Sequence, residues 1–165
     1  MAKEQSFDVV SQVDMQEVDN AVQQASKELK QRYDLKDSGA TISLDKAAAT
    51  VTVSAPTDFV GNQIVDVLGT KLVRRGVDLK ALDWGAAESA SGGSVRITAR
   101  VVNGIEADLA RRINKEIRDQ KFKVKVQIEG DKLRVFSPKR DELQEVIAFL
   151  KDQDYGIPLQ YTNYR

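Results

Sequence analysis

The side chains best suited to bind an anionic group lie close together in the second half of the chain. At alternate positions this stretch carries Lys121, Lys123, Lys125, Gln127, Lys132, Arg134 and Phe136. Alternate residues of a strand project from the same face, so these side chains share one face of a predicted hairpin. Lysine attracts phosphate as a point charge, Arg134 can bind it through two parallel hydrogen bonds, and Phe136 offers a ring for stacking. The pattern predicts a face that binds a phosphate-bearing ligand.

A purely structural interpretation accounts for the same residues. Soluble sheets often expose Lys and Arg, which improve solubility and prevent edge strands from pairing with other chains. The predicted face also lacks the run of aromatic residues on which sequence-reading RNA modules stack bases. The sequence leaves both interpretations open.

Two further cations, Arg96 and Arg100, project to one side of a strand predicted over residues 94–102. Their neighbours depend on the strand topology. If this strand pairs within its own half, the two arginines join Lys132 and Arg134. If it pairs with the first half, they lie beside the strand of residues 50–55, and Asp8 faces the second sheet instead.

Net charge is zero overall, but it is unevenly distributed. The chain has 10 basic and 14 acidic residues up to Ala90, and 15 basic and 11 acidic residues after it. This asymmetry favours an anionic partner for the second half.

The composition excludes several classes of chemistry. The 165 residues include no His and no Cys, which rules out Cys/His zinc sites, Ser-His-Asp or Cys-His catalysis, and disulfides. No glycine-rich loop is followed by Lys-Ser/Thr and a helix start. Acidic pairs such as Asp152 and Asp154 lack the spacing of metal ligands. We therefore expect no catalytic residue, no metal and no cofactor, and we rank an enzyme acting on phosphodiesters last.

The chain contains no predicted export or membrane segment. Residues 1–6 have no apolar stretch behind a basic start, and no window approaches the roughly 20 apolar residues of a membrane span. We expect a cytoplasmic protein without membrane contact.

The elements that position these residues occur twice. The first half predicts a strand, helix, strand, strand, helix and strand over 6–13, 14–34, 41–45, 50–55, 58–76 and 77–84. The second half repeats this order over 94–102, 105–117, 121–128, 132–136, 140–150 and from Gly156. Val53-Ser54-Ala55-Pro56 and Val135-Phe136-Ser137-Pro138 lie 82 residues apart, and Gly76-Val77 and Gly156-Ile157 lie 80 apart. The sequence therefore contains an internal duplication.

This order is that of the ferredoxin-like split βαβ unit. We predict an α+β protein of two tandem ferredoxin-like domains, residues 1–84 and 94–165, joined by a linker over 85–93. Each antiparallel sheet is covered by two helices on one face. Strands 6–13 and 94–102 either stay in their own domain or are exchanged between the two, and the patterning alone allows both.

Several motifs closely resemble the bacterial YajQ family from end to end. They are Ser6-Phe7-Asp8-Val9-Val10-Ser11, Gln16-Glu17-Val18-Asp19-Asn20-Ala21, Arg32-Tyr33-Asp34-Leu35-Lys36, Lys71-Leu72-Val73-Arg74-Arg75-Gly76-Val77, Gly104-Ile105, Lys123-Val124-Lys125-Val126-Gln127-Ile128, Gly130-Asp131, Arg134-Val135, Arg140-Asp141-Glu142-Leu143-Gln144 and Asn163-Tyr164-Arg165. The chain departs from the family pattern at Asp37, Val102 and Ser137-Pro138. The last two departures remove basic or flexible groups.

The resemblance implies two ferredoxin-like domains with exchanged first strands, in a cytoplasmic nucleotide-binding protein without established catalysis. It also implies that some members act as cyclic di-GMP receptors that influence transcription. Our leading hypothesis is thus a non-enzymatic protein that binds a nucleotide or cyclic dinucleotide and acts through a protein partner such as a transcription regulator. The alternative is an RNA or single-stranded nucleic-acid binder that uses the same face. The predicted binding residues are Lys123, Lys125, Lys132, Arg134, Phe136, Arg96 and Arg100.

Overall fold

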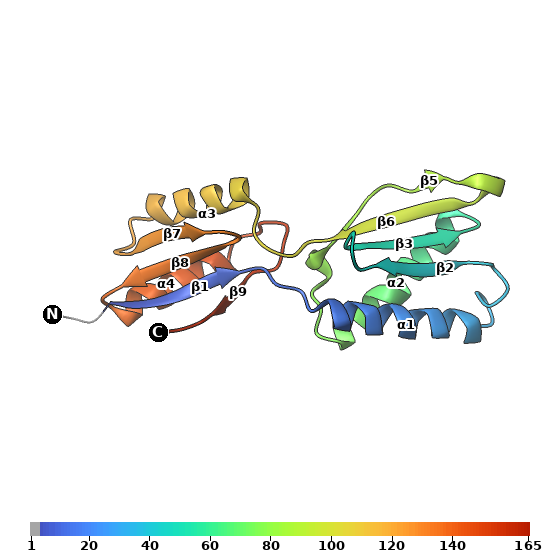
Figure 1. Ribbon diagram of the computed structural model, residues 1–165, viewed down its shortest axis with the longest axis horizontal. Coiled ribbons are helices and arrows are strands. Elements are labelled where there is room, and N and C mark those ends of the chain that lie inside the picture. Colours follow the sequence, from blue (N-terminus) through green and yellow to red (C-terminus); the bar gives the residue numbers. More distant parts are fainter. Residues whose placement is uncertain (1–3) are drawn as a thin grey trace. The chain divides into compact units, whose positions relative to one another are not determined.

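The computed structural model describes residues 4–165, which form two compact units (Figure 1). The terminal unit contains the residues up to Gln12 together with Asn103–Arg165, and the central unit contains Val13–Val102. The described residues form four α-helices and two antiparallel sheets, which confirms the predicted α+β class with two ferredoxin-like domains. Residues 1–3, part of the segment expected to lack an export signal, lie outside this range. Across residues 4–165, no helix combines the length and apolar character needed to cross a membrane.

The central sheet has the strand order β2-β3-β6-β4, formed by β2 (Thr41–Asp45), β3 (Thr50–Ala55), β6 (Val95–Val101) and β4 (Leu82–Trp84). The short strand β5 (Glu88–Ser89) also pairs with β6. Helices α1 (Met15–Gln31) and α2 (Asp58–Arg74) pack on one face. Two short 3-10 helices complete the unit: η1 (Leu79–Ala81) leads from α2 into β4, and η2 (Ser91–Gly93) lies between β5 and β6.

The terminal sheet has the order β7-β8-β1-β9, formed by β7 (Lys125–Glu129), β8 (Lys132–Ser137), β1 (Gln5–Val10) and β9 (Gln160–Thr162). Helices α3 (Ala107–Asp119) and α4 (Arg140–Lys151) supply the apolar side chains that cover one face. Among the described residues of this unit, no helix lies on the opposite face.

The first strand of each half lies in the sheet of the other half. Strand β1 pairs with β8 and β9, while β6 pairs with β3 and β4, all antiparallel. Phe7 and Val9 of β1 are fully buried in the terminal core, although helix α1, which follows them in sequence, packs in the central unit. Residues 85–93, expected to form a linker, lie between β4 and β6 and belong to the central unit.

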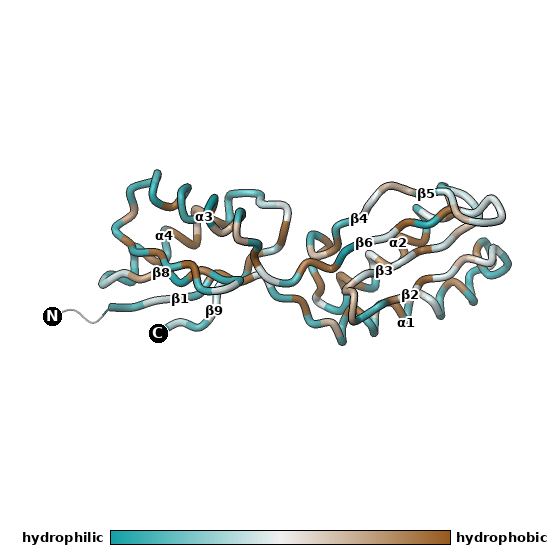
Figure 2. The backbone as a smooth tube through the Cα atoms, turned by 45° about the horizontal axis from the view of Figure 1, so that its top comes forward, coloured by the Kyte–Doolittle hydropathy of each residue, from teal (hydrophilic) through white to brown (hydrophobic). Residues whose placement is uncertain are grey.

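Periodic apolar residues build each core. Ala110, Ile113 and Ile117 lie on one stripe of α3 and are fully buried, whereas the residues between them are charged or polar. Figure 2 shows this alternation along α3, where the tube changes repeatedly between teal and brown. Burial of these stripes against the alternating apolar residues of the sheet supplies most of the stabilisation of such a helix.

The closing strands are shorter than predicted. The expected strand 77–84 contains η1, because the Asp78 carboxylate accepts a hydrogen bond from the Lys80 backbone N–H at 2.9 Å and caps a turn there. The expected strand from Gly156 begins only at Gln160, after Pro158, which has no N–H to donate to a sheet.

Candidate functional site

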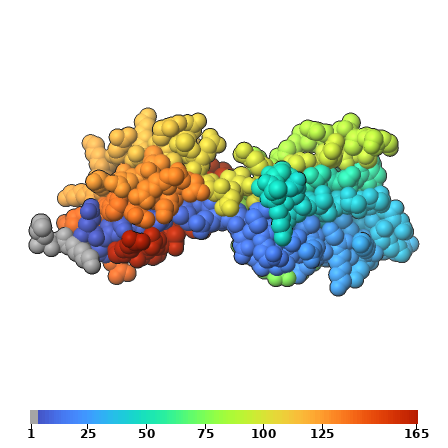
Figure 3. Space-filling model, in the orientation of Figure 1, coloured from blue at the N-terminus to red at the C-terminus, as the bar shows by residue number. Residues whose placement is uncertain are grey.

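The uncovered face of the terminal sheet carries most of the predicted binding residues. In β8, Leu133 and Val135 point into the core, so Lys132, Arg134 and Phe136 project from the opposite face. Strand pairing places Lys125 beside Phe136, and Gln127 beside Arg134. Figure 3 shows the β7–β8 hairpin, in orange, on the surface of its unit. We call this surface the open face.

A buried carboxylate organises the open face. Asp8 of β1 is 2% exposed and lies in register with Arg134. Its two oxygens accept hydrogen bonds from Arg134 Nε at 2.8 Å, Arg134 Nη2 at 3.4 Å, Lys132 Nζ at 3.3 Å and Asn163 Nδ2 at 2.9 Å. The carboxylate thereby joins β8, β1 and the C-terminal segment.

These contacts hold Asp8 in its charged form. Burial by itself raises the pKa of Asp8, but the hydrogen bonds from Arg134, Asn163 and Lys132 outweigh burial and lower the pKa from 3.8 to about 2. The hydrogen bond to Asp8 in turn raises the pKa of Arg134.

Charge pairing makes the open face less basic than the sequence predicts. Arg134 and Lys132 both form ion pairs with Asp8, and Arg134 Nη1 also lies 3.6 Å from Glu129 Oε2. By contrast, Lys123 and Lys125 are exposed, and neither ammonium group has an ion pair with a described residue. Phe136 is half-buried between Lys125 and Ser6, its partners in register. The predicted strand 121–128 begins only at Lys125, so Lys123 lies in a bend just before the sheet. Lys125 and Phe136 on the open face, with Lys123 close to Lys125 in the sequence, are therefore the groups available to a ligand.

Arg96 and Arg100 do not join this set. Both lie on β6 in the central sheet, where Arg96 pairs in register with Ser54 and Glu88, and Arg100 with Thr50. Arg100 Nη2 also lies 4.0 Å from Asp83 Oδ2. The structure thus divides the seven predicted residues between the two units, with Arg96 and Arg100 in the central unit and the other five in the terminal unit.

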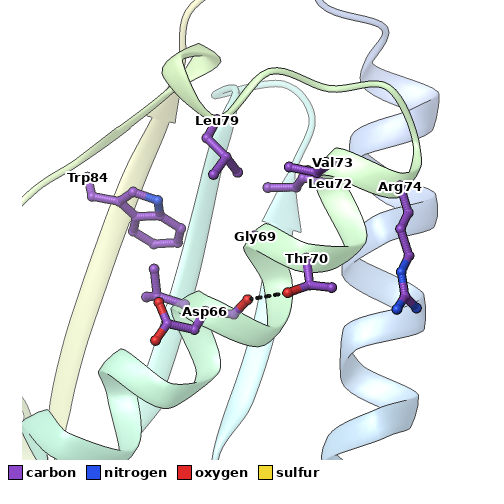
Figure 4. A pocket seen from close by; sticks show the side chains of 9 residues that line it. Asp66, Gly69, Thr70, Leu72, Val73, Arg74, Leu79 and Trp84 are labelled. Atoms are coloured by element: carbon purple, nitrogen blue, oxygen red, sulfur yellow. Dashed lines mark hydrogen bonds between the residues drawn. The ribbon is translucent and has the colours of Figure 1, made fainter.

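Sequence reasoning did not predict a groove in the central unit. It has a volume of about 680 Å³ and lies beside α2, where Gly69, Val73, Leu79 and Trp84 line it together with Asp66 (Figure 4). We call it the α2 groove. Gly69, in the middle of the helix predicted over 58–76, was the only local signal for the α2 groove in the sequence. Within the described residues, no group of three or more acidic side chains is placed to hold a metal.

Comparison with known proteins identifies the family. The model of the nucleotide-binding protein YajQ-like family matches residues 5–165. The chain belongs to the YajQ family. Over the full length of both chains, it is 46% identical to a protein from Endomicrobium trichonymphae, 45% to one from Alkaliphilus oremlandii and 47% to one from Synechococcus elongatus. All three YajQ relatives are named nucleotide-binding proteins.

Proposed function

We propose that this YajQ-family chain is a non-enzymatic nucleotide-binding protein and that the open face of the terminal sheet is its binding site. The observation that carries this proposal is the pairing of Lys125 with Phe136 on an uncovered sheet face. A base can stack on the Phe136 ring while Lys123 and Lys125 attract its phosphates. The names of the relatives support the same class of ligand.

The preferred ligand in this proposal is a cyclic dinucleotide such as cyclic di-GMP. Its two phosphodiesters carry two negative charges, which match the two unpaired ammonium groups of Lys123 and Lys125. Asp8 repels additional negative charge and keeps Lys132 and Arg134 occupied, so the face disfavours triphosphates. We place this receptor in the cytoplasm, where the bound state passes to a protein partner such as a transcription regulator.

Single-stranded RNA is the alternative ligand. Strand β7 is an edge strand, and Lys121, Lys123 and Lys125 follow one another at alternate positions in the sequence that leads into it. Of these lysines only Lys125 lies in β7, while Lys121 and Lys123 lie in the turn and bend that lead into it. Such a basic segment can follow a phosphate backbone without reading its sequence. Affinity would then fall steeply with salt, because each neutralised phosphate releases counterions.

The test is isothermal titration of the chain with cyclic di-GMP, GTP, ATP and a short RNA at low and physiological salt. We expect saturable binding of cyclic di-GMP that persists at physiological salt, and at least a tenfold loss, about 1.4 kcal/mol, in the double variant Lys123→Ala/Lys125→Ala. The matched control Lys115→Ala/Arg118→Ala removes the same charge from α3 of the same unit and should bind normally. Equal affinities of all three proteins would exclude the open face, and RNA binding that collapses with salt would favour the alternative.

A further inference from the structure

Helix α2 contains two interior glycines, and packing explains only one of them. Glycine inside a helix destabilises the helix relative to alanine, so an interior glycine calls for a reason. At Gly61 a Cβ atom would lie 2.9 Å from Ile97 Cδ1, so close packing favours glycine there. At Gly69 the nearest atom to an added Cβ would be Leu79 Cδ2 at 3.5 Å, an ordinary contact. A side chain would fit at Gly69, and a large one would occupy the α2 groove.

The groove keeps large apolar groups in contact with solvent. Val73 is 58% exposed and Leu79 is 51% exposed, while Trp84 is half-buried. Figure 4 shows the Trp84 indole facing α2 across the groove, with Leu79 at the upper end. A volume of about 680 Å³ lies within the range of sites for small molecules, which are mainly apolar and aromatic with a few polar groups.

The acidic group that lines the groove together with Trp84 is the carboxylate of Asp66. Figure 4 shows it on the Trp84 side of α2, whereas the Arg74 side chain extends away from Trp84. Within residues 4–165 the Asp66 side chain has no hydrogen bond or ion pair; the Thr70 hydroxyl donates to the Asp66 backbone oxygen instead, at 3.2 Å. An ionised carboxylate only accepts hydrogen bonds. A ligand group that contacts Asp66 must therefore bring N–H or O–H donors, whereas Arg74, which also lines the groove, lies away from the indole.

We propose that the α2 groove binds a purine base with two adjacent N–H donors, as guanine has, with the ring against Trp84 and its donor edge on Asp66. Guanine presents its ring N–H and its exocyclic amino group side by side, so one carboxylate can accept from both. Adenine presents an amino group next to a ring acceptor, which the carboxylate would repel. This site is separate from the open face of the terminal unit, and it recognises a base without requiring a phosphate.

Trp84 is the only tryptophan of the chain, so its fluorescence reports on the groove directly. We would titrate the full chain with guanosine, inosine and adenosine, none of which carries a phosphate. We expect saturable quenching by guanosine with at least tenfold tighter binding than adenosine, because a bidentate pair of hydrogen bonds distinguishes one base from another. Inosine, which lacks the amino group, should fall between them.

Three variants make the test specific. Gly69→Leu should fill the groove and abolish guanosine binding while the protein remains folded by circular dichroism, because leucine favours the helix. Asp66→Asn should remove the preference for guanosine over adenosine. Lys123→Ala/Lys125→Ala should bind guanosine normally, since these lysines belong to the terminal unit.

No saturable quenching, equal affinity for guanosine and adenosine, or normal binding by folded Gly69→Leu would overturn the proposal. A negative guanosine titration would not count against nucleotide binding at the open face, because nucleosides lack the phosphates on which that face depends. Conversely, loss of nucleotide binding at the open face would not alter the guanosine titration.

Discussion

Replacing Asp8 with Asn should destabilise the terminal unit, because Asp8 is the buried counterion of Lys132 and Arg134. Asn has nearly the same shape and retains one oxygen to accept a hydrogen bond. The substitution therefore removes mainly the negative charge. It leaves the two cations side by side on β8 without their shared partner.

The pKa of Asp8 gives the size of the effect. Its fall from 3.8 to about 2 corresponds to roughly 2 kcal/mol of unfolding free energy at neutral pH. Arg134 and Lys132 retain 19% and 34% exposure of their side chains, so water can solvate them in the variant. The loss of unfolding free energy should thus be about 2 kcal/mol, below the 3–5 kcal/mol typical of breaking a fully buried ion pair.

The same pKa fixes the pH dependence. A carboxylate whose pKa is lowered by folding contributes its full stabilisation above its unfolded pKa, and this contribution is lost as the pH falls through the folded value. Wild-type chain and Asp8→Asn should therefore differ by about 2 kcal/mol above about pH 5 and converge as the pH approaches about 2.

Urea denaturation at several pH values, with amide hydrogen exchange of β1 and β8, measures this difference in the terminal unit. Asp119→Asn, which removes an exposed carboxylate from α3, serves as the control and should change stability by less than about 0.5 kcal/mol. Equal stability of wild type and Asp8→Asn at pH 7, or a difference that persists unchanged at pH 2, would refute the reasoning.

Four further substitutions test the packing and one partly buried hydrogen bond. Gly69→Ala should raise the free energy of unfolding by about 0.5–1 kcal/mol in urea denaturation followed by tryptophan fluorescence, whereas Gly61→Ala should give no such gain, because its Cβ would lie 2.9 Å from Ile97; equal gains would contradict this. Tyr155→Phe removes a hydrogen bond of 3.2 Å to a Glu116 oxygen and should cost about 1 kcal/mol in thermal or urea unfolding. Ile113→Asp buries a charge at a fully buried position and should unfold the terminal unit in amide exchange, while a native-like exchange pattern would show the core assignment to be wrong.

Local periodicity was sufficient to predict most elements. The alternation of Ile42, Leu44, Val51 and Val53 places the hairpin where β2 and β3 lie, because one buried face fixes both the period and the register of a strand. Strand exchange could not be predicted in this way. Phe7 and Val9 satisfy the alternation equally well in either sheet, and only long-range packing selects between the two.

The candidate site was predictable only in part, for the same reason. Alternation places Lys132, Arg134 and Phe136 on one face without any knowledge of the fold. The ion pair between Arg134 and Asp8 joins residues 126 positions apart and depends on the exchange of β1. For the same reason Arg96 and Arg100 lie in the other sheet. Local pattern thus predicts which side chains share a face, but not which charges neutralise them.

The most direct test of nucleotide binding at the open face is an amide chemical-shift titration of the full chain with cyclic di-GMP. The proposal predicts saturable shifts of Lys125, Gln127 and Phe136 that disappear in Lys123→Ala/Lys125→Ala. The helices α3 and α4, on the opposite side of the sheet, should change little. Absence of shifts in β7 and β8, or saturable shifts confined to other elements, would contradict the proposed site.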